Sequence, residues 1–171
     1  GVWRTEAPKI LTDNTLTLTG ASRADLAVRC NSNSTISVAG TQVANVIIEG
    51  TSNSTAHPYD EDGVSTWSAV RPDYLRDLRQ EEFVAGSQTI RMGARTVLGR
   101  RFDPDVPNIE ETADGVQEWT VRGAANHPFH LHIYHVQVQA DCGPYEAGEF
   151  YDVIAGNCDL RFDMSDAEAY E

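Results

Sequence analysis

The sequence has 171 residues, of which 40% are hydrophobic and 23% charged; this predicts about one globular domain and argues against disorder of the whole chain. A net charge of −13 argues against nucleic acid or an anionic membrane as a partner, because binding to phosphates requires clustered Lys and Arg side chains. No stretch approaches the ~20 apolar residues that a membrane-spanning helix needs.

The N-terminal third of the chain consists of short β-branched runs separated by Gly, Asn, Asp and Ser, a pattern typical of strands and turns. It predicts strands at 16–19, 24–30, 35–38 and 43–48. Asn33 and Asn53 each begin an Asn-Ser-Thr sequon, so both are predicted glycosylation sites. The first residue is Gly1 and not Met, which we interpret as a processed or partial chain. The sequons and this start favour a secreted or cell-surface protein.

The run at 53–63 is polar, acidic and rich in turn-forming residues, so we expect an exposed connection there. This predicts the end of one domain at 1–56, a linker at 57–80 with a short helix at 72–80, and a second domain at 81–171. Neither domain has enough strands to be complete, and we expect both ends to be truncated.

The C-terminal part contains further strand patterns at 88–92, 116–122, 131–139, 150–154 and 160–162. Trp119 and Val121 alternate with polar residues, as in a strand with one buried face. Trp119 and Phe129 are therefore expected in the core. Many short strands without a long amphipathic helix predict an all-β sandwich.

The cysteines also favour an extracellular protein. Cys142 and Cys158 flank a loop of hairpin size, and a disulfide closing a loop of this length contributes about 3 kcal/mol in the chain-entropy model. Cys30 is left over: it either pairs with a residue outside this sequence or is a buried thiol.

Four of the five histidines lie between positions 127 and 135. His130 and His132 are two residues apart, so on a strand both point to the same side. His127 lies beyond the intervening proline and can serve a different site, whereas His135 falls on the opposite face and is not expected to be a ligand. Imidazole binds Cu, Zn, Fe and Ni, so the cluster predicts a metal site without selecting the metal. His57, in the polar linker, is expected to be a surface residue.

The segment His-Pro-Phe-His-Leu-His at 127–132 resembles the His-Pro-x-His-x-His motif of the multicopper oxidases, the family of laccases, ascorbate oxidase and ferroxidases. Residues 99–105 and 116–121 resemble the start of the third cupredoxin domain and the strand before the histidines. Residues 16–26 are similar to the late second domain, and 71–78 to the linker into the last one. The resemblance implies Greek-key β-sandwiches of cupredoxin type, incomplete at both ends of this chain.

The resemblance also implies roles for the three histidines. His127 would bind the type 1 copper that accepts electrons from a reducing substrate, His130 the type 2 copper, and His132 one of the type 3 pair. Family members oxidise phenols or metal ions one electron at a time and reduce O2 to water at the trinuclear cluster. Which substrate this chain would serve does not follow from the sequence.

The sequence departs from the family pattern in two respects. It contains neither the His-Cys-His-x-x-x-His segment that supplies the type 1 thiolate nor the His-x-His pairs of the first domain. Alone, the chain would therefore lack most copper ligands and would not be an active oxidase. The remainder of a parent polypeptide, or another chain, would have to complete the copper centres.

Three further interpretations stay open. The chain is alternatively a non-catalytic extracellular module, structural or metal-binding, within an assembly. A zinc-binding or zinc-hydrolytic site is a third hypothesis, although no carboxylate has a ligand spacing within the cluster. An acidic stretch precedes the histidines and is either a solvated loop or a docking site for a cation. Its residues are Asp103, Asp105, Glu110, Glu111 and Asp114.

Overall fold

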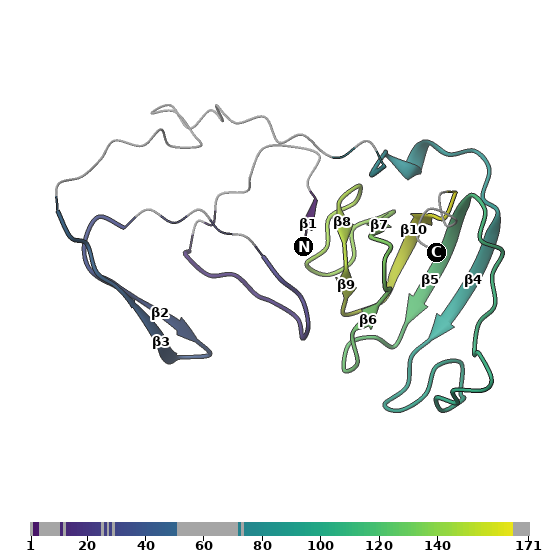
Figure 1. The fold of residues 1–171 in the computed structure, drawn as a ribbon, viewed down its shortest axis with the longest axis horizontal. Coiled ribbons are helices and arrows are strands. Elements are labelled where there is room, and N and C mark those ends of the chain that lie inside the picture. Colours follow the sequence, from purple (N-terminus) through teal and green to yellow (C-terminus); the bar gives the residue numbers. More distant parts are fainter. Residues whose placement is uncertain are drawn as a thin grey trace. The chain divides into compact units, whose positions relative to one another are not determined.

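A computed structural model describes the backbone of residues 2–3 together with residues 11, 13–24, 26, 28, 30–50, 72 and 74–165. They belong to two compact units, described separately below: Gly1–Ala24 with Trp67–Glu171, and Asp25–Thr66 (Figure 1). The predicted domain boundary at 56–57 and most of the predicted linker lie outside the described residues.

The larger unit is built on a six-stranded sheet with the order β1-β8-β7-β10-β5-β4 (Figure 1). Its strands are β1 Val2–Trp3, β4 Gly86–Arg91, β5 Val116–Arg122, β7 Val136–Val138, β8 Phe150–Tyr151 and β10 Cys158–Asp163. A second sheet pairs β6 Phe129–His130 with β9 Val153–Ile154. β4 and β5 are parallel, whereas the other neighbours are antiparallel.

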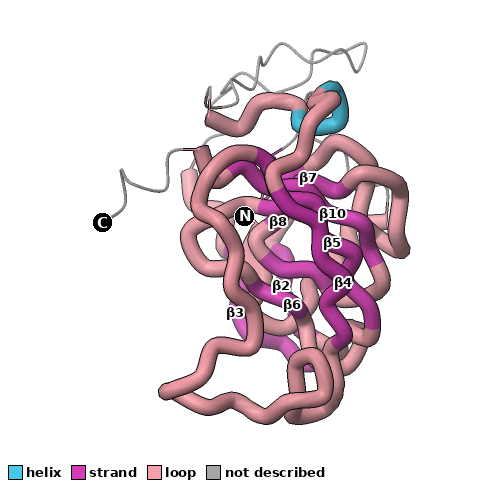
Figure 2. The backbone as a smooth tube through the Cα atoms, turned by 90° about the vertical axis from the view of Figure 1, so that its right-hand side faces the viewer, coloured by secondary structure: helices cyan, strands magenta, loops and turns pink. Residues whose placement is uncertain are grey.

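The predicted all-β class is confirmed. The part of the chain that the structure describes contains strands, loops and a single 3₁₀ turn, η1 Leu78–Gln80, but no α-helix (Figure 2). No helix in the described ranges is long and apolar enough to cross a bilayer.

The core lies between the six-stranded sheet and the β6–β9 pair. Val121 and Leu160 from the large sheet and Phe129 and Ile154 from the small one belong to a single buried cluster. Trp119 contributes its ring edge-on to a neighbouring phenylalanine at a centroid distance of 4.9 Å. Burial of each such side chain stabilises the fold by about 1.5–3 kcal/mol. The predicted core positions of Trp119 and Phe129 are thus confirmed.

Several predicted elements differ from the structure. The strand predicted at 131–139 is interrupted: residues 131–135 form a loop, and only β7 at its end is a strand. Ile133 in this loop has a φ of 73°, which a β-branched residue in a strand does not adopt. Residues 16–19 are described and are not a strand. The helix predicted at 72–80 is reduced to η1, which spans its last three residues.

The turn η1 is held on the sheet by a buried glutamine. Gln137 Oε1 accepts the backbone N–H of Leu78 at 2.8 Å, and its Nε2 donates to Asp77 Oδ1 and to the Gly148 carbonyl, both at 2.9 Å. Asp77 also pairs with Arg79, whose hydrogen bonds and charge hold the pKa of that carboxyl well below its usual range. The segment entering the larger unit is therefore fixed by satisfied polar contacts as well as by burial of Leu78.

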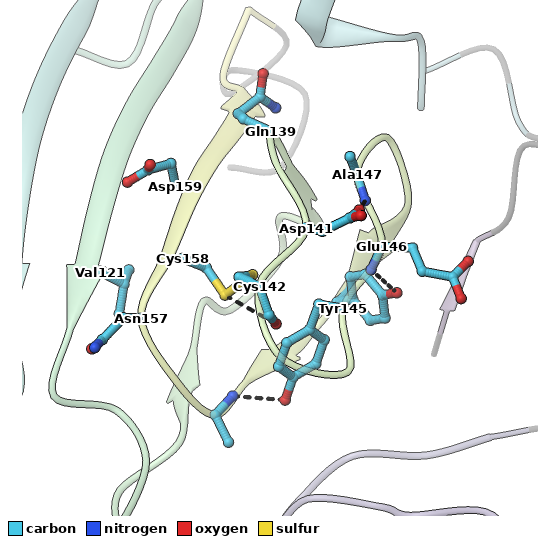
Figure 3. Close-up of a disulfide and its surroundings, with 12 residues drawn as sticks. Val121, Gln139, Asp141, Cys142, Tyr145, Glu146, Ala147, Asn157, Cys158 and Asp159 are labelled. Atoms are coloured by element: carbon cyan, nitrogen blue, oxygen red, sulfur yellow. Dashed lines mark hydrogen bonds between the residues drawn. A yellow bond between two sulfur atoms is a disulfide. The ribbon is translucent and has the colours of Figure 1, made fainter.

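The predicted disulfide between Cys142 and Cys158 is present, with an S–S distance of 2.03 Å (Figure 3). It joins the loop after β7 to the first residue of β10. Two buried tyrosines fasten the same loop: the Tyr145 hydroxyl accepts the N–H of Ala155 at 2.7 Å, and the Tyr151 hydroxyl accepts a backbone N–H at 3.1 Å. The covalent link thus reinforces a region that is already hydrogen-bonded.

The smaller unit is a hairpin of β2 Ser34–Val38 and β3 Thr41–Val46. Its two-residue turn has positive φ at both positions, 47° at Ala39 and 80° at Gly40, the geometry that matches the twist of a hairpin. Apolar side chains of this unit are exposed in the structure, including Ile36 at 49% and Val38 at 62%. Cys30 in the same unit is a free thiol.

Candidate functional site

The histidine motif follows a tight turn at the end of β5. Gly123 has a φ of 80°, and a Cβ there would lie 2.4 Å from the Met92 carbonyl oxygen, so this position requires glycine. The Gly123 N–H donates to Asn157 Oδ1 at 2.8 Å. The chain then bends through His127, which is exposed, and enters β6 after a proline. Pro128 cannot donate to a sheet ladder, which agrees with its place before the strand.

β6 positions His130 at a strand end. His130 pairs with Val153 of β9 in antiparallel register; the preceding residue, Phe129, is buried, whereas His130 is exposed. Its Nδ1 lies 2.6 Å from the carbonyl oxygen of Asp152. A carbonyl only accepts hydrogen bonds, so Nδ1 carries a proton, and in the neutral ring Nε2 holds the lone pair. This is the tautomer in which Nε2 can ligate a metal ion.

The structure brings His130 and His132 together. Their ring centroids are 5.0 Å apart with the planes inclined at 58°, and both residues are exposed. The sequence-based reason for this pairing, a continuous strand with both rings on one face, is wrong because β6 ends at His130. The loop that follows, with its left-handed Ile133, places the rings side by side instead.

His135 has a different environment. It is half-buried, and burial lowers its pKa from the usual value for histidine, so the neutral form is favoured. It lines a cavity of about 420 Å³ together with Tyr134, Phe150 and the Arg76–Asp163 ion pair. Aromatic, aliphatic and charged groups line this space, and no second imidazole is among the described residues that line it.

An aspartate beside the histidine pair was not predicted from the sequence. Asp152 is 9% exposed, and its side chain forms an ion pair with Arg23 at 3.3 Å while its carbonyl sets the tautomer of His130. No sequence signal identifies a backbone carbonyl as the partner of a histidine. Only the pairing of β6 with β9 makes Asp152 and His130 neighbours.

The donor set fits copper in type but is not a complete site. Imidazole nitrogen is a good copper ligand, and His130 is held in the ligating tautomer. Within residues 74–165 and the other described ranges, no group of three or more His, Cys, Asp or Glu could hold a metal ion. Cys142 and Cys158 form a disulfide and therefore supply no thiolate. Two neighbouring imidazoles require further donors before they can form a stable site.

Of the two predicted glycosylation sites, only Asn33 is described. It is exposed at the start of the hairpin. Its Oδ1 accepts the N–H of Ile48 at 2.9 Å, and its side-chain nitrogen takes no part in that bond. Asn53 lies outside the described residues.

Comparisons of the chain with protein-family models, with curated protein sequences and with solved structures returned no significant match.

Proposed function

We propose that this chain is part of a secreted multicopper oxidase, and that His130 and His132 are copper ligands. The observation that supports the proposal best is the exposed imidazole pair at the end of β6, within a His-Pro-x-His-x-His sequence. His130 has its Nδ1 proton fixed by the Asp152 carbonyl, so that Nε2 is available without any rearrangement. The disulfide supports the extracellular location, because such bonds persist in oxidising compartments.

The residues of this chain would hold and orient copper. The buried β6–β9 pair fixes the backbone of His130, and the hydrogen bond to Asp152 fixes its ring. His132 approaches from the following loop, so the two imidazoles reach neighbouring positions from a short segment. Copper bound there would supply one-electron redox chemistry and would bind O2. His127, on the other side of the proline, is the proposed ligand of the separate copper that accepts electrons from a phenol or a metal ion.

The remaining ligands would come from outside the described residues, either from the rest of a parent polypeptide or from another chain. The fold proposed for each part is the Greek-key cupredoxin sandwich, of which the larger unit would be one incomplete copy. Cys142 and Cys158 are bonded to each other, so the larger unit supplies no thiolate ligand for a type 1 copper among its described residues.

A second candidate is a non-catalytic extracellular module, structural or metal-binding, with the same fold. The observation that favours it is the small number of donors: the described part of the chain gathers fewer than three metal-ligating side chains in one place. In this case the histidine pair would bind copper weakly or not at all.

The first candidate is tested on the intact protein by metal analysis, by visible and EPR spectra, and by oxygen uptake with a phenol or Fe(II). We expect several coppers per molecule, the blue absorption of a copper thiolate, and oxygen uptake that depends on the reducing substrate. Little or no bound copper, without a blue band or oxygen uptake, would favour the non-catalytic module. Tightly bound zinc in place of copper would contradict the oxidase proposal.

A further inference from the structure

A second group of side chains, unrelated to the histidines, surrounds the first residue of β4. Gln117 of β5 is fully buried and pairs with Gly86 of β4 in the parallel register. Its Nε2 donates to the Thr112 carbonyl at 3.2 Å. Exchanging the amide oxygen and nitrogen of Gln117 would place its oxygen against the Thr112 carbonyl oxygen, so the orientation of this amide is fixed. Gln117 Oε1 is consequently left buried without a hydrogen-bond partner in the structure.

The carboxylate of Glu111 shares this position with Gln117. A Cβ at Gly86 would lie 2.2 Å from Gln117 Oε1 and 3.0 Å from Glu111 Oε2, so both oxygens converge on the space that this glycine leaves open. Glu111 Oε1 is also buried without a hydrogen-bond partner. Two side-chain oxygens, both acceptors when the carboxyl group is ionised, therefore lie next to the position that a Cβ of Gly86 would occupy.

Among the described residues, no Lys, Arg or His forms an ion pair with this arrangement. No ion pair in the described part of the chain includes Glu111. Glu111 is partly buried, and withdrawing one oxygen of an uncompensated carboxylate from water costs free energy. A second unpaired acceptor nearby adds to that cost. A water molecule would satisfy the hydrogen bonds but not the charge, whereas a cation satisfies both. The loop before Gln117 is also acidic, which raises the local concentration of cations.

We propose that Glu111 and Gln117 bind a hard divalent cation of the calcium type above Gly86. Carboxylate and amide oxygens are the ligands that such ions prefer, and soft metals such as copper favour nitrogen and sulfur donors. Two protein side chains with water completing the shell form a weak site. The expected Kd is about 10⁻⁴–10⁻³ M, the range of extracellular calcium modules. The cation joins the 108–112 loop to β5 at the end of the sheet.

Thermal unfolding of the intact protein in calcium-free buffer and in CaCl2, at matched ionic strength, tests the proposal. At a calcium concentration tenfold above Kd we expect Tm to rise by about 3–6 °C. Glu111→Gln should abolish this rise, because it removes the charge and keeps the shape. Glu110→Gln is the matched control: Glu110 is its exposed neighbour, and the rise should persist.

The two variants also differ in calcium-free buffer. There Glu111→Gln should be at least as stable as the unmodified protein, because its amide can donate to Gln117 Oε1 and no charge remains next to that oxygen. An equal calcium response in Glu111→Gln, or no calcium response in the unmodified protein, would overturn the proposal. A loss of stability of Glu111→Gln without calcium would overturn it too, since Glu111 would then already have a protein or water partner.

Discussion

The two units have similar alternating, β-branched sequences but bury their side chains to very different extents. In the larger unit Ile90, Val121 and Leu160 are completely buried, because β4, β5 and β10 pack against the β6–β9 pair. In the hairpin, Ile36 and Val38 are 49% and 62% exposed. A two-stranded hairpin alone is marginally stable in water.

The difference shows what a strand pattern does and does not determine. Alternation specifies which side chains share a face, but burial needs a second surface to cover that face. In the larger unit the β6–β9 pair supplies this second surface. The aliphatic residues of β2 and β3 contribute little to stability unless another surface covers them.

The largest expected effect is a core truncation that breaks the packed unit. Leu160→Ala should lower the free energy of unfolding by about 2–5 kcal/mol, because it removes a fully buried side chain from the centre of β10. Ile36→Ala in the hairpin is the comparison, with an expected change within about 0.5 kcal/mol. Denaturant unfolding of the intact protein measures both. A cost of several kcal/mol for Ile36→Ala would mean that this face is covered in solution.

The disulfide offers a second way to test the comparison, because it reinforces the larger unit alone. Replacing both Cys142 and Cys158 by Ala should cost about 3 kcal/mol in the chain-entropy model for a loop with a sequence separation of 16. Calorimetry of the oxidised protein and the double variant gives the difference. A Cys30→Ala variant serves as the control and should unfold at an unchanged Tm. An unchanged Tm in the double variant would mean that the hydrogen-bonded tyrosines hold the loop without the bond.

A smaller effect is expected at η1, the turn that polar contacts of Asp77 and Gln137 hold on the sheet of the larger unit. The folded-state pKa of Asp77 lies below the unfolded value, so its contribution is complete above about pH 4–5 and is lost as the pH falls further. Asp77→Asn should cost about 1 kcal/mol at neutral pH, because the carboxylate is partly exposed to solvent. Unfolding measured from pH 7 to pH 3 should show the two proteins converging at low pH. A constant difference over this range would contradict the role of the charge.

Much of the larger fold could be predicted from the sequence. The strand at 116–122 matches β5, and Trp119 and Phe129 are core residues, because period-two alternation and aromatic burial are local properties. The cysteine spacing sufficed for the disulfide. Local patterns failed where the backbone departs from a strand: the 131–135 loop lies within an apolar run, and nothing in that run predicts a left-handed Ile133.

The candidate site was predictable in its residues but not in its geometry. The spacing of His130 and His132 indicated that they act together, and the rings are adjacent, but for a different reason. The role of the Asp152 carbonyl depends on the pairing of two strands more than 20 residues apart, which a single sequence does not specify. Glu111 and Gln117 are close in the sequence, but Gly86 lies beside their oxygens only because β4 and β5 are parallel neighbours.

The most direct test of the proposed copper role is the copper content of the intact protein after replacing both His130 and His132 by Asn. His135→Asn is the matched control, since His135 belongs to the same segment and lines a cavity that neither member of the pair lines. We predict that the double variant loses bound copper, with its EPR signal reduced, while the control keeps the full content and the same fold. Full copper content in the double variant would contradict the assignment of these histidines as ligands.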